Sequence, residues 1–352
     1  MQLPAEMKAI VYHGPGKKAF EERPRPALQK ATDAIVKVVA TTICGTDLHI
    51  LKGDVPAVVE GRILGHEGVG VVEEIGAAVS GFAPGARVLI SCITSCGRCE
   101  ACKKGMYSHC ADGGWILGHR IDGTQAGYVR IPHADNSLYA APPGLDDAAL
   151  VMLSDILPTG FEVGVRNGGV KPGDTVAIVG AGPIGLAALV TAQLYAPAEL
   201  IVVDLDENRL AIAKTLGATK LVDGRDGRAV ERVMELTSGR GVDVAIEAVG
   251  LPSSFDVCQD VLAAGGRLAN VGVHGKSVAL KLETLWTRNV TITTGLVDTD
   301  TTPMLLKSSL AGRLSPRKLV SHELPFGEML KGYDIFEHAA KTKALKVVLR
   351  AG

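Results

Sequence analysis

The hydrophobic pattern of the first 145 residues is that of short β-strands. Runs of β-branched and aliphatic residues at 34–40, 68–76 and 86–90 are separated by Pro-Gly, Ser-Gly and Asp-Gly pairs, which mark turns. Repeated short strands of this kind favour a folded-over barrel or a sandwich. Between 146 and 169 the apolar spacing becomes helical, and Pro158 is expected to kink or break that helix.

From about residue 172 the pattern changes to a regular alternation of strand and helix. Amphipathic or apolar helical stretches separate six predicted strands, at 175–180, 199–204, 220–224, 242–250, 266–273 and 290–296. This alternation predicts a parallel, doubly wound α/β sheet. The last fifty residues return to mixed structure and end in a predicted strand at 346–350.

Length and charge narrow the class of protein. A chain of 352 residues is long enough for two domains. Its net charge of -1 provides no basic excess for holding a polyanion, which argues against nucleic acid as a partner. No apolar run of 18 residues suggests a membrane span, and the first residues lack the pattern of a signal peptide. We therefore expect a cytoplasmic protein whose thiols stay reduced.

Four of the seven cysteines lie within fifteen residues, at Cys96, Cys99, Cys102 and Cys110. Four thiolates at this spacing can surround one ion as a tetrahedron, which favours a closed, structural Zn²⁺ site over a disulfide framework. An iron–sulfur cluster and four unrelated buried thiols are the alternatives.

A glycine-rich motif, GAGPIG, occupies residues 180–185 between a predicted strand and a predicted helix. Gly180, Gly182 and Gly185 fit the dinucleotide-binding pattern G-x-G-x-x-G, and Pro183 and Ile184 complete it. In this context the glycines allow a tight turn, close approach of a pyrophosphate, and packing of the helix on the strand. A merely structural turn is the alternative.

Asp204 ends the next predicted strand, 19 residues after Gly185. A carboxylate at that place accepts hydrogen bonds from the adenosine ribose and repels a 2′-phosphate, so the motif favours NAD over NADP. The alternative is a helix cap, because a helix also begins nearby, through Asp206.

Cys44 and His66 are candidate ligands of a second metal ion. They lie 22 residues apart, which proves nothing by spacing alone. Taken singly, each is as well explained as an ordinary packing or loop residue.

Taken together and in this order, the motifs resemble those of a known enzyme family. The β-rich start, the segment GHEGVGVVEEIG, the four-cysteine lobe and the later GAGPIG resemble the zinc-containing alcohol dehydrogenases of the medium-chain dehydrogenase/reductase superfamily. The resemblance covers the chain after its first six residues, and it is closest to the bacterial secondary-alcohol branch. It implies a GroES-like catalytic domain with a structural zinc lobe at 1–156 and 297–352, and a Rossmann domain at 157–296.

The resemblance also assigns the catalytic residues. Cys44, His66 and Asp155 match the ligands of a catalytic zinc, with Glu67 behind the ion and able to ligate it; a helix cap is the alternative for Asp155. Thr46 matches the hydroxyl that takes the alcohol proton, and His49 matches the outer member of its relay to solvent, roles that suit a hydroxyl and an imidazole. Two zinc ions per chain are expected.

Further residues match positions around the cofactor and the substrate. The predicted NAD contacts beyond the glycine motif and Asp204 are Thr159, Arg209, Val249, Val273 and Lys346; Thr159 is expected near the nicotinamide, Arg209 near the ribose and Lys346 near the pyrophosphate. Gly45 replaces an arginine that some relatives use on the pyrophosphate. Cys92 and Trp115 match the substrate channel, although either could be core.

The expected activity is reversible hydride transfer between a primary or secondary alcohol and NAD, which gives an aldehyde or ketone. A polyol or vicinal-diol dehydrogenase is the main alternative. A zinc-free reductase is disfavoured by the lobe and by Cys44 and His66, and a nonenzymatic cofactor-binding protein by the presence of Thr46. The partners expected are the small-molecule substrate and other copies of the chain, as a homo-oligomer and most simply a tetramer.

Overall fold

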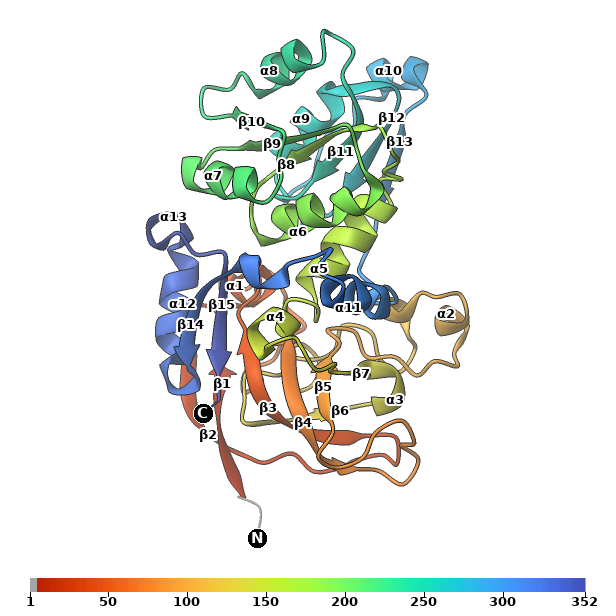
Figure 1. The fold of residues 1–352 in the computed structure, drawn as a ribbon. Coiled ribbons are helices and arrows are strands. Elements are labelled where there is room, and N and C mark those ends of the chain that lie inside the picture. Colours follow the sequence, from red (N-terminus) through yellow and green to blue (C-terminus); the bar gives the residue numbers. More distant parts are fainter. Residues whose placement is uncertain (1–4, 352) are drawn as a thin grey trace. The chain divides into compact units, whose positions relative to one another are not determined.

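The chain forms two compact units in a computed structural model that describes residues 5–351 (Figure 1). One unit, called the catalytic unit below, comprises residues up to Asp155 and from Asp298 onward; the other, the sheet unit, comprises Ile156–Val297. These boundaries lie one residue from the expected ones.

The catalytic unit is built mostly on antiparallel strands, with β14 and β15 paired in parallel. A seven-stranded sheet has the order β14-β15-β3-β4-β5-β7, with β6 also paired to β3, and a separate hairpin joins β1 to β2. The strands are β1 (Glu6–Tyr12), β2 (Lys18–Pro24), β3 (Ala34–Thr42), β4 (Gly68–Ile75), β5 (Arg87–Ile90), β6 (Tyr128–Ile131), β7 (Leu138–Ala140), β14 (Val320–Pro325) and β15 (Lys346–Arg350). The predicted strands at 34–40, 68–76, 86–90 and 346–350 are confirmed.

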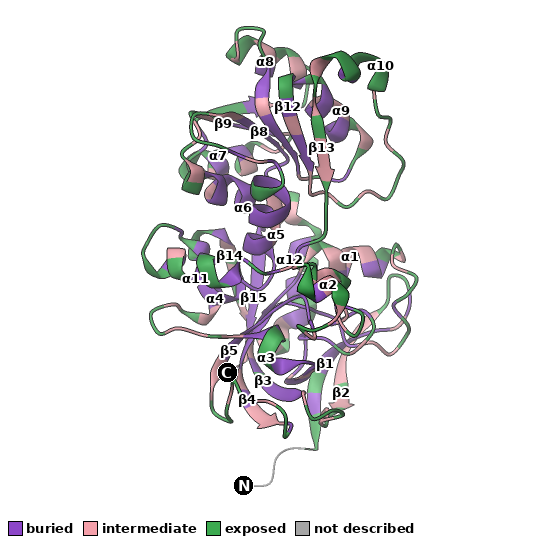
Figure 2. Cartoon of the chain, turned by 90° about the vertical axis from the view of Figure 1, so that its right-hand side faces the viewer, coloured by how far each residue is buried: buried purple, intermediate pink, exposed green. Residues whose placement is uncertain are grey.

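Helices of the catalytic unit are short, apart from α1, α11 and α12. They are α1 (Gly45–Lys52), α2 (Glu100–Lys103), η1 (Tyr107–His109), α3 (Ala134–Ser137), α4 (Asp147–Val151), α11 (Thr302–Leu310), η5 (Pro316–Leu319), η6 (Phe326–Glu328), α12 (Met329–Glu337) and α13 (Ala339–Thr342). The strands of the large sheet are mostly buried, whereas exposed residues gather on loops and on the outer faces of these helices (Figure 2). The C-terminal segment belongs to this unit because β15 pairs with β3.

The sheet unit has six strands that are all parallel. They are β8 (Thr175–Val179), β9 (Glu199–Asp204), β10 (Lys220–Asp223), β11 (Val242–Glu247), β12 (Leu262–Asn270) and β13 (Thr291–Thr294), in the order β10-β9-β8-β11-β12-β13. Because the order reverses between β8 and β11, the carboxyl ends of these two strands flank the switch point of a doubly wound sheet. The predicted fold class is confirmed.

Helices cover both faces of this sheet. In Figure 1, α6 (Pro183–Ala192) and α7 (Glu207–Thr215) lie on one face, and α8 (Ala229–Leu236) and α9 (Pro252–Asp260) lie on the other. The remaining elements are α5 (Ile156–Thr159), the π-helix η2 (Gly160–Arg166), η3 (Gln193–Tyr195), α10 (Leu282–Leu285) and η4 (Trp286–Arg288). With both faces covered, Val176, Ala177 and Ile178 of β8 are all fully buried.

Pro158 does not end the helix in which it lies. It is the third residue of α5, and the chain passes directly from Thr159 into η2. The helical segment predicted at 146–169 is therefore interrupted earlier, between α4 and α5, and after Pro158 the helix changes type. Gly160 permits close packing there, since a Cβ at this position would lie 2.6 Å from the backbone nitrogen of Ala188 in α6.

Candidate functional site

Four potential metal ligands meet inside the catalytic unit. Cys44, His66, Glu67 and Asp155 each present one ligand atom, and these atoms all lie within 4.8 Å of one another. Three separate segments supply them: the link between β3 and α1, the residues before β4, and the link between α4 and α5. The sheet thus assembles in space what the sequence keeps 111 residues apart.

A buried polar network fixes the backbone at Cys44, the N-cap of α1. The amide N–H of Cys44 donates to Asp47 Oδ2 at 2.9 Å, and Gln125 Nε2 donates to the same oxygen at 2.9 Å. Tyr333 Oη then donates to Gln125 Oε1 at 2.7 Å. Burial raises the pKa of Asp47, against the effects of its neighbours. The sequence analysis missed this network, of which only the pair Cys44 and Asp47 leaves a local signal, as an N-cap and its third helical residue.

Asp155 is the centre of the group. Its Oδ2 lies 3.3 Å from His66 Nε2 and 3.7 Å from Cys44 Sγ. Its other oxygen, Oδ1, lies 3.6 Å from Cys92 Sγ. Burial alone lowers the pKa of His66, but the hydrogen bonds with Asp155 and Cys44 outweigh it and hold that pKa well above its ordinary value. The group is therefore a place that stabilises positive charge.

Glu67 is paired with a buried lysine. Lys346 Nζ donates to Glu67 Oε1 at 2.6 Å and to the carbonyl oxygen of Ile43 at 3.1 Å. Burial raises the pKa of Glu67 to about 7, and the Lys346 charge acts against that rise.

Lys346, for which a contact with the cofactor pyrophosphate is predicted, lies in the catalytic unit. Its side chain is 1% exposed and its ammonium group is directed at Glu67. It therefore supports the metal-ligand group, and its contact with the pyrophosphate stays a prediction.

The predicted proton relay starts beside this group. Thr46 Oγ1 lies 3.6 Å from Cys44 Sγ, in the first turn of α1. His49 follows one turn later, half-exposed, with Nδ1 2.9 Å from Asp54 Oδ2. One member of the pair thus lies at the ligands and the other reaches solvent.

The two predicted substrate-pocket residues also lie at the metal-ligand group. Cys92 is 2% exposed and contacts Asp155, as described above. Trp115 meets the His66 ring edge-on, with ring centroids 6.3 Å apart, and stacks on His119 at 4.4 Å. Since Cys92 is buried, its contact is with the ligand Asp155 and not with open space.

The four lobe cysteines converge as well. The ligand sulfurs of Cys96, Cys99, Cys102 and Cys110 lie within 4.8 Å of one another, and all seven cysteines of the chain are free of disulfides. Amide N–H groups point at the sulfurs, from Cys96 to Cys110 at 3.2 Å and from Cys99 to Cys96 at 3.4 Å. Hydrogen bonds of this kind, from the amides of Cys102 and Ala111, lower the pKa of Cys99 to about 6.

Both groups fit zinc. Sulfurs bound at about 2.3 Å to a tetrahedral ion lie roughly 3.8 Å apart, close to the 4.0 Å between Cys96 and Cys102. The group formed by Cys44, His66, Glu67 and Asp155 is called the mixed group below. In it, one thiolate and the Asp155 carboxylate balance the two charges of the ion, and the charge of Glu67 is already balanced by Lys346. Glu67 Oε2 is buried and has no hydrogen-bond partner among the described residues, which leaves it available to a cation.

The glycine motif of the sheet unit has the form that a phosphate requires. Gly180 has a φ of +103°, and a Cβ on Gly185 would lie 1.8 Å from the carbonyl oxygen of Gly180, so neither position accepts a side chain. A Cβ on Gly182, by contrast, would meet open space. Gly182 is the N-cap of α6, with Pro183 and Ile184 in its first turn. The backbone therefore leaves room for an anion at the helix N-terminus.

Asp204 is fixed beside this motif. Its Oδ2 accepts from the amide of Ala181 at 2.5 Å and its Oδ1 from the amide of Asp206 at 2.8 Å. The cap of α7 is Asp206, which accepts from the amides of Asn208 and Arg209. The helix-cap alternative for Asp204 therefore falls, and each of its oxygens keeps a lone pair for another donor.

The other predicted cofactor residues are spread over the sheet unit. Val249 and Val273 follow β11 and β12 and are 45% and 67% exposed. Arg209 lies in the first turn of α7, and Thr159 ends α5.

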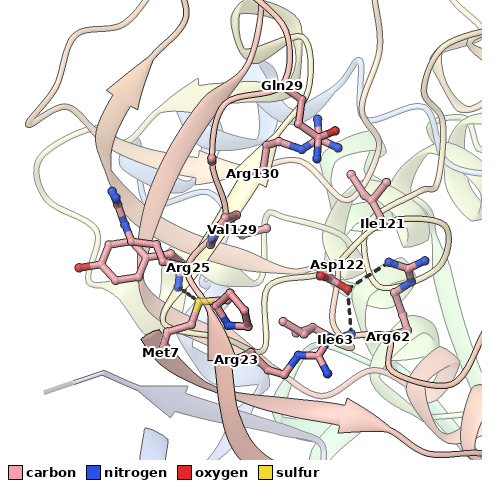
Figure 3. A pocket seen from close by; sticks show the side chains of 14 residues that line it. Met7, Arg23, Arg25, Gln29, Arg62, Ile63, Ile121, Asp122, Val129 and Arg130 are labelled. Carbon is pink, nitrogen blue, oxygen red and sulfur yellow. Dashed lines mark hydrogen bonds and ion pairs between the residues drawn. The ribbon is translucent and has the colours of Figure 1, made fainter. Parts of the chain in front are cut away.

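A cavity of about 350 Å³ lies elsewhere in the catalytic unit (Figure 3). It is lined by four arginines, each of which is paired with a carboxylate: Arg23 with Glu21, Arg25 with Glu74, Arg62 with Asp122 and Arg130 with Asp33. None of its lining residues belongs to the groups above, and we assign it no function.

Comparison with known proteins gives the family. Residues 30–143 match the model of the alcohol dehydrogenase GroES-like domain, and residues 183–308 match that of the zinc-binding dehydrogenase. An alcohol dehydrogenase of Cupriavidus necator is 36% identical over 99% of this chain and 100% of its own length. The chain belongs to the zinc-type alcohol dehydrogenases. It is thus an oxidoreductase of the medium-chain dehydrogenase/reductase superfamily, and the resemblance stated from the sequence is confirmed.

Solved structures agree with this membership. A zinc-dependent alcohol dehydrogenase 2 from Streptococcus pneumonia, in its apo form, is 54% identical, with 98% of each chain covered and a TM-score of 0.94. An alcohol dehydrogenase from Thermus sp. ATN1 is 34% identical, covers 98% of this chain and 100% of its own, and has a TM-score of 0.91. The catalytic unit of this alcohol dehydrogenase is accordingly a GroES-like domain. Among residues 5–351 there is no helix with both the length and the apolar character needed to cross a membrane.

Proposed function

We propose that this chain is an NAD-linked alcohol dehydrogenase that oxidises primary or secondary alcohols reversibly to aldehydes or ketones. The observation that carries the proposal is the convergence of Cys44, His66, Glu67 and Asp155 with the Thr46 hydroxyl 3.6 Å from the Cys44 sulfur. A zinc-free reductase or a nonenzymatic cofactor-binding protein has no use for such a constellation.

In this proposal Cys44, His66 and Asp155 hold a zinc ion, which supplies Lewis acidity that lowers the pKa of the alcohol hydroxyl. Thr46 accepts the proton of that hydroxyl and passes it toward His49, whose half-exposed ring releases it to solvent. Trp115, beside His66, contributes an apolar wall that orients the carbon chain and excludes water. Lys346 holds Glu67 behind the ligands.

The cofactor choice rests on Asp204. Two ribose hydroxyls can donate to the free lone pairs of its carboxylate, whereas the 2′-phosphate of NADP would meet a negative charge that two backbone amides hold in place. Hydrogen bonds to a charged group are worth roughly 1.5–3 kcal/mol each. We expect NAD to be preferred by at least ~100-fold in kcat/KM, on the order of 2.7 kcal/mol.

Steady-state kinetics with NAD and NADP test this choice. The wild type should prefer NAD, and Asp204→Gly should lose NAD use while gaining NADP use. Asp206→Gly is the matched control, because it removes a neighbouring carboxylate that caps α7, and it should leave the preference unchanged. Equal use of both cofactors by the wild type would overturn the assignment of Asp204.

The substrate class is tested with the same assay over primary alcohols, secondary alcohols, vicinal diols and polyols. The proposal expects kcat/KM to be highest for simple alcohols. A clear preference for polyols or diols would replace it with the alternative, and NAD reduction by none of the four classes would remove it.

A further inference from the structure

Two loops at the carboxyl edge of the parallel sheet lie where a bound dinucleotide would place its nicotinamide half. The glycine motif follows β8 and Asp204 ends β9, which places the adenosine half over these strands. A dinucleotide crosses such a sheet at its switch point, here between β8 and β11. Its other half therefore lies over the ends of β11 and β12, where loops 248–251 and 271–274 begin.

These two loops pack closely against each other at two glycines, Gly250 and Gly272. Gly250 has a φ of +85°, and a Cβ there would lie 2.3 Å from the carbonyl oxygen of Val273. A Cβ on Gly272 would lie 2.3 Å from the backbone nitrogen of Gly250 and 2.3 Å from Glu247 Oε2. Neither loop can shift on its own, so they form one body that presents Val249 and Val273 outward.

One buried residue joins both loops, through its carboxylate to the first and through its backbone carbonyl to the second. Glu247, the last residue of β11, is 0% exposed. Its Oε1 accepts from the amides of Val249 at 3.0 Å and Gly250 at 2.9 Å, within the first loop. Its backbone carbonyl oxygen accepts from the amides of Val271 at 2.9 Å and Gly272 at 3.1 Å, within the second.

Two side chains complete the attachment. Ser254, in the first turn of α9, donates to Glu247 Oε1 at 2.6 Å. His274 Nε2 lies 3.4 Å from Glu247 Oε2 and 2.8 Å from Asn270 Oδ1. Since both neighbours of Nε2 are acceptors, this nitrogen is the donor. A buried carboxylate surrounded by donors in this way is strongly held, because each bond to the charged oxygens is charge-assisted.

We propose that Glu247 is a positioning residue for the nicotinamide half of the cofactor. It holds loops 248–251 and 271–274 in the conformation that receives the nicotinamide ring. The loops therefore lose little conformational freedom when the cofactor binds. This inference rests on the proposed function, since it presupposes that the sheet unit binds a nicotinamide dinucleotide. No metal is involved.

The test compares two ligands of the full-length protein. NADH is the complete dinucleotide, whereas ADP-ribose keeps the adenosine, the pyrophosphate and the second ribose and lacks only the nicotinamide ring. Glu247→Gln keeps the shape of the side chain but turns one acceptor oxygen into a donor that faces amide N–H groups. We expect it to weaken NADH binding by at least ~10-fold, measured by NADH fluorescence, and to change ADP-ribose binding, measured by calorimetry, by less than ~2-fold.

Two further variants accompany it. Asp243→Asn removes a carboxylate from the opposite, amino end of the same strand, where it accepts from the amide of Thr175 and pairs with Arg240; it should leave NADH binding unchanged. Ser254→Ala removes one bond to Glu247 without changing any charge, and it should weaken NADH selectively but less. If Glu247→Gln fails to fold, Ser254→Ala serves as the test variant in its place.

The outcomes separate the two proposals. If the wild type binds neither NADH nor ADP-ribose, the proposed function fails. If the wild type binds both, and Glu247→Gln and Ser254→Ala weaken both ligands equally or neither, cofactor binding stands and the positioning role of Glu247 is overturned.

Discussion

The catalytic unit holds two groups of metal ligands that differ in how the chain assembles them. The lobe takes four thiols from residues 96–110, around one short helix and one turn of 3₁₀-helix. The second group takes a thiol, an imidazole and two carboxylates from segments up to 111 residues apart, held by the sheet. A closed set of thiols can only bind, whereas the mixed set has a hydroxyl and a relay beside it. Under the proposed function, the first group therefore contributes stability and the second carries out the chemistry.

The largest expected effect comes from removing a ligand of the mixed group. Cys44→Ser and His66→Ala should each lower kcat/KM by orders of magnitude, while the thermal unfolding temperature and NADH binding stay close to wild type. His13→Ala removes a histidine that pairs with Glu21 on the hairpin and should change neither. Full activity in a purified His66→Ala protein would contradict the division of roles.

The same difference explains how much of each metal-ligand group can be predicted from the sequence. The lobe was found by spacing alone, because its ligands are neighbours in the chain. Cys44 and His66 needed a family resemblance, since nothing in their separation implies a site. The six parallel strands were found because a sheet buried on both faces leaves continuous apolar runs.

The contacts that the sequence does not reveal join residues far apart in the chain. Gln125 reaches Tyr333 across 208 residues of sequence, and no local pattern announces that contact. For Lys346 the family resemblance implies a place near the cofactor pyrophosphate, and no local pattern indicates that it pairs with a buried carboxylate. Only the three-dimensional structure shows that it is buried against Glu67.

The next largest effect is expected on stability, from breaking the buried ion pair between Lys346 and Glu67 that supports the mixed group. Lys346→Met leaves Glu67 buried without its partner, and breaking such a pair should cost about 3 kcal/mol of unfolding free energy. Adding Glu67→Gln should restore part of that loss, because no uncompensated charge remains. Denaturant unfolding of both single variants and the double variant measures the coupling. Additive losses would show that the two side chains do not support each other.

A smaller effect is expected in the lobe. Cys99→Ser should lower the unfolding temperature by roughly 5 °C through weaker metal binding, with kcat per folded chain nearly unchanged. Glu100→Ser, in the same helix and exposed, serves as its control and should leave both quantities at wild-type values. A Cys99→Ser protein with normal stability and zinc content but a slow chemical step would mean that the two groups have been assigned in reverse.

The smallest effect is expected at Cys92. Its thiol contacts Asp155 Oδ1 at 3.6 Å, a weak hydrogen bond that turns the other oxygen toward Cys44 and His66. Cys92→Ala should weaken zinc binding by no more than ~10-fold, measured by competition with a chelator. Complete loss of the ion would make Cys92 a ligand and enlarge the mixed group.

Zinc content per chain is the most direct test of the account, because both groups and their separate roles enter it. Mass spectrometry of the purified metal-loaded protein should find about two zinc ions per wild-type chain and about one in His66→Ala, which should be inactive. Cys99→Ser should also hold about one, yet remain active per folded chain. A wild type with a single zinc, or a His66→Ala protein that keeps both ions or loses both, would contradict the account of two independent sites.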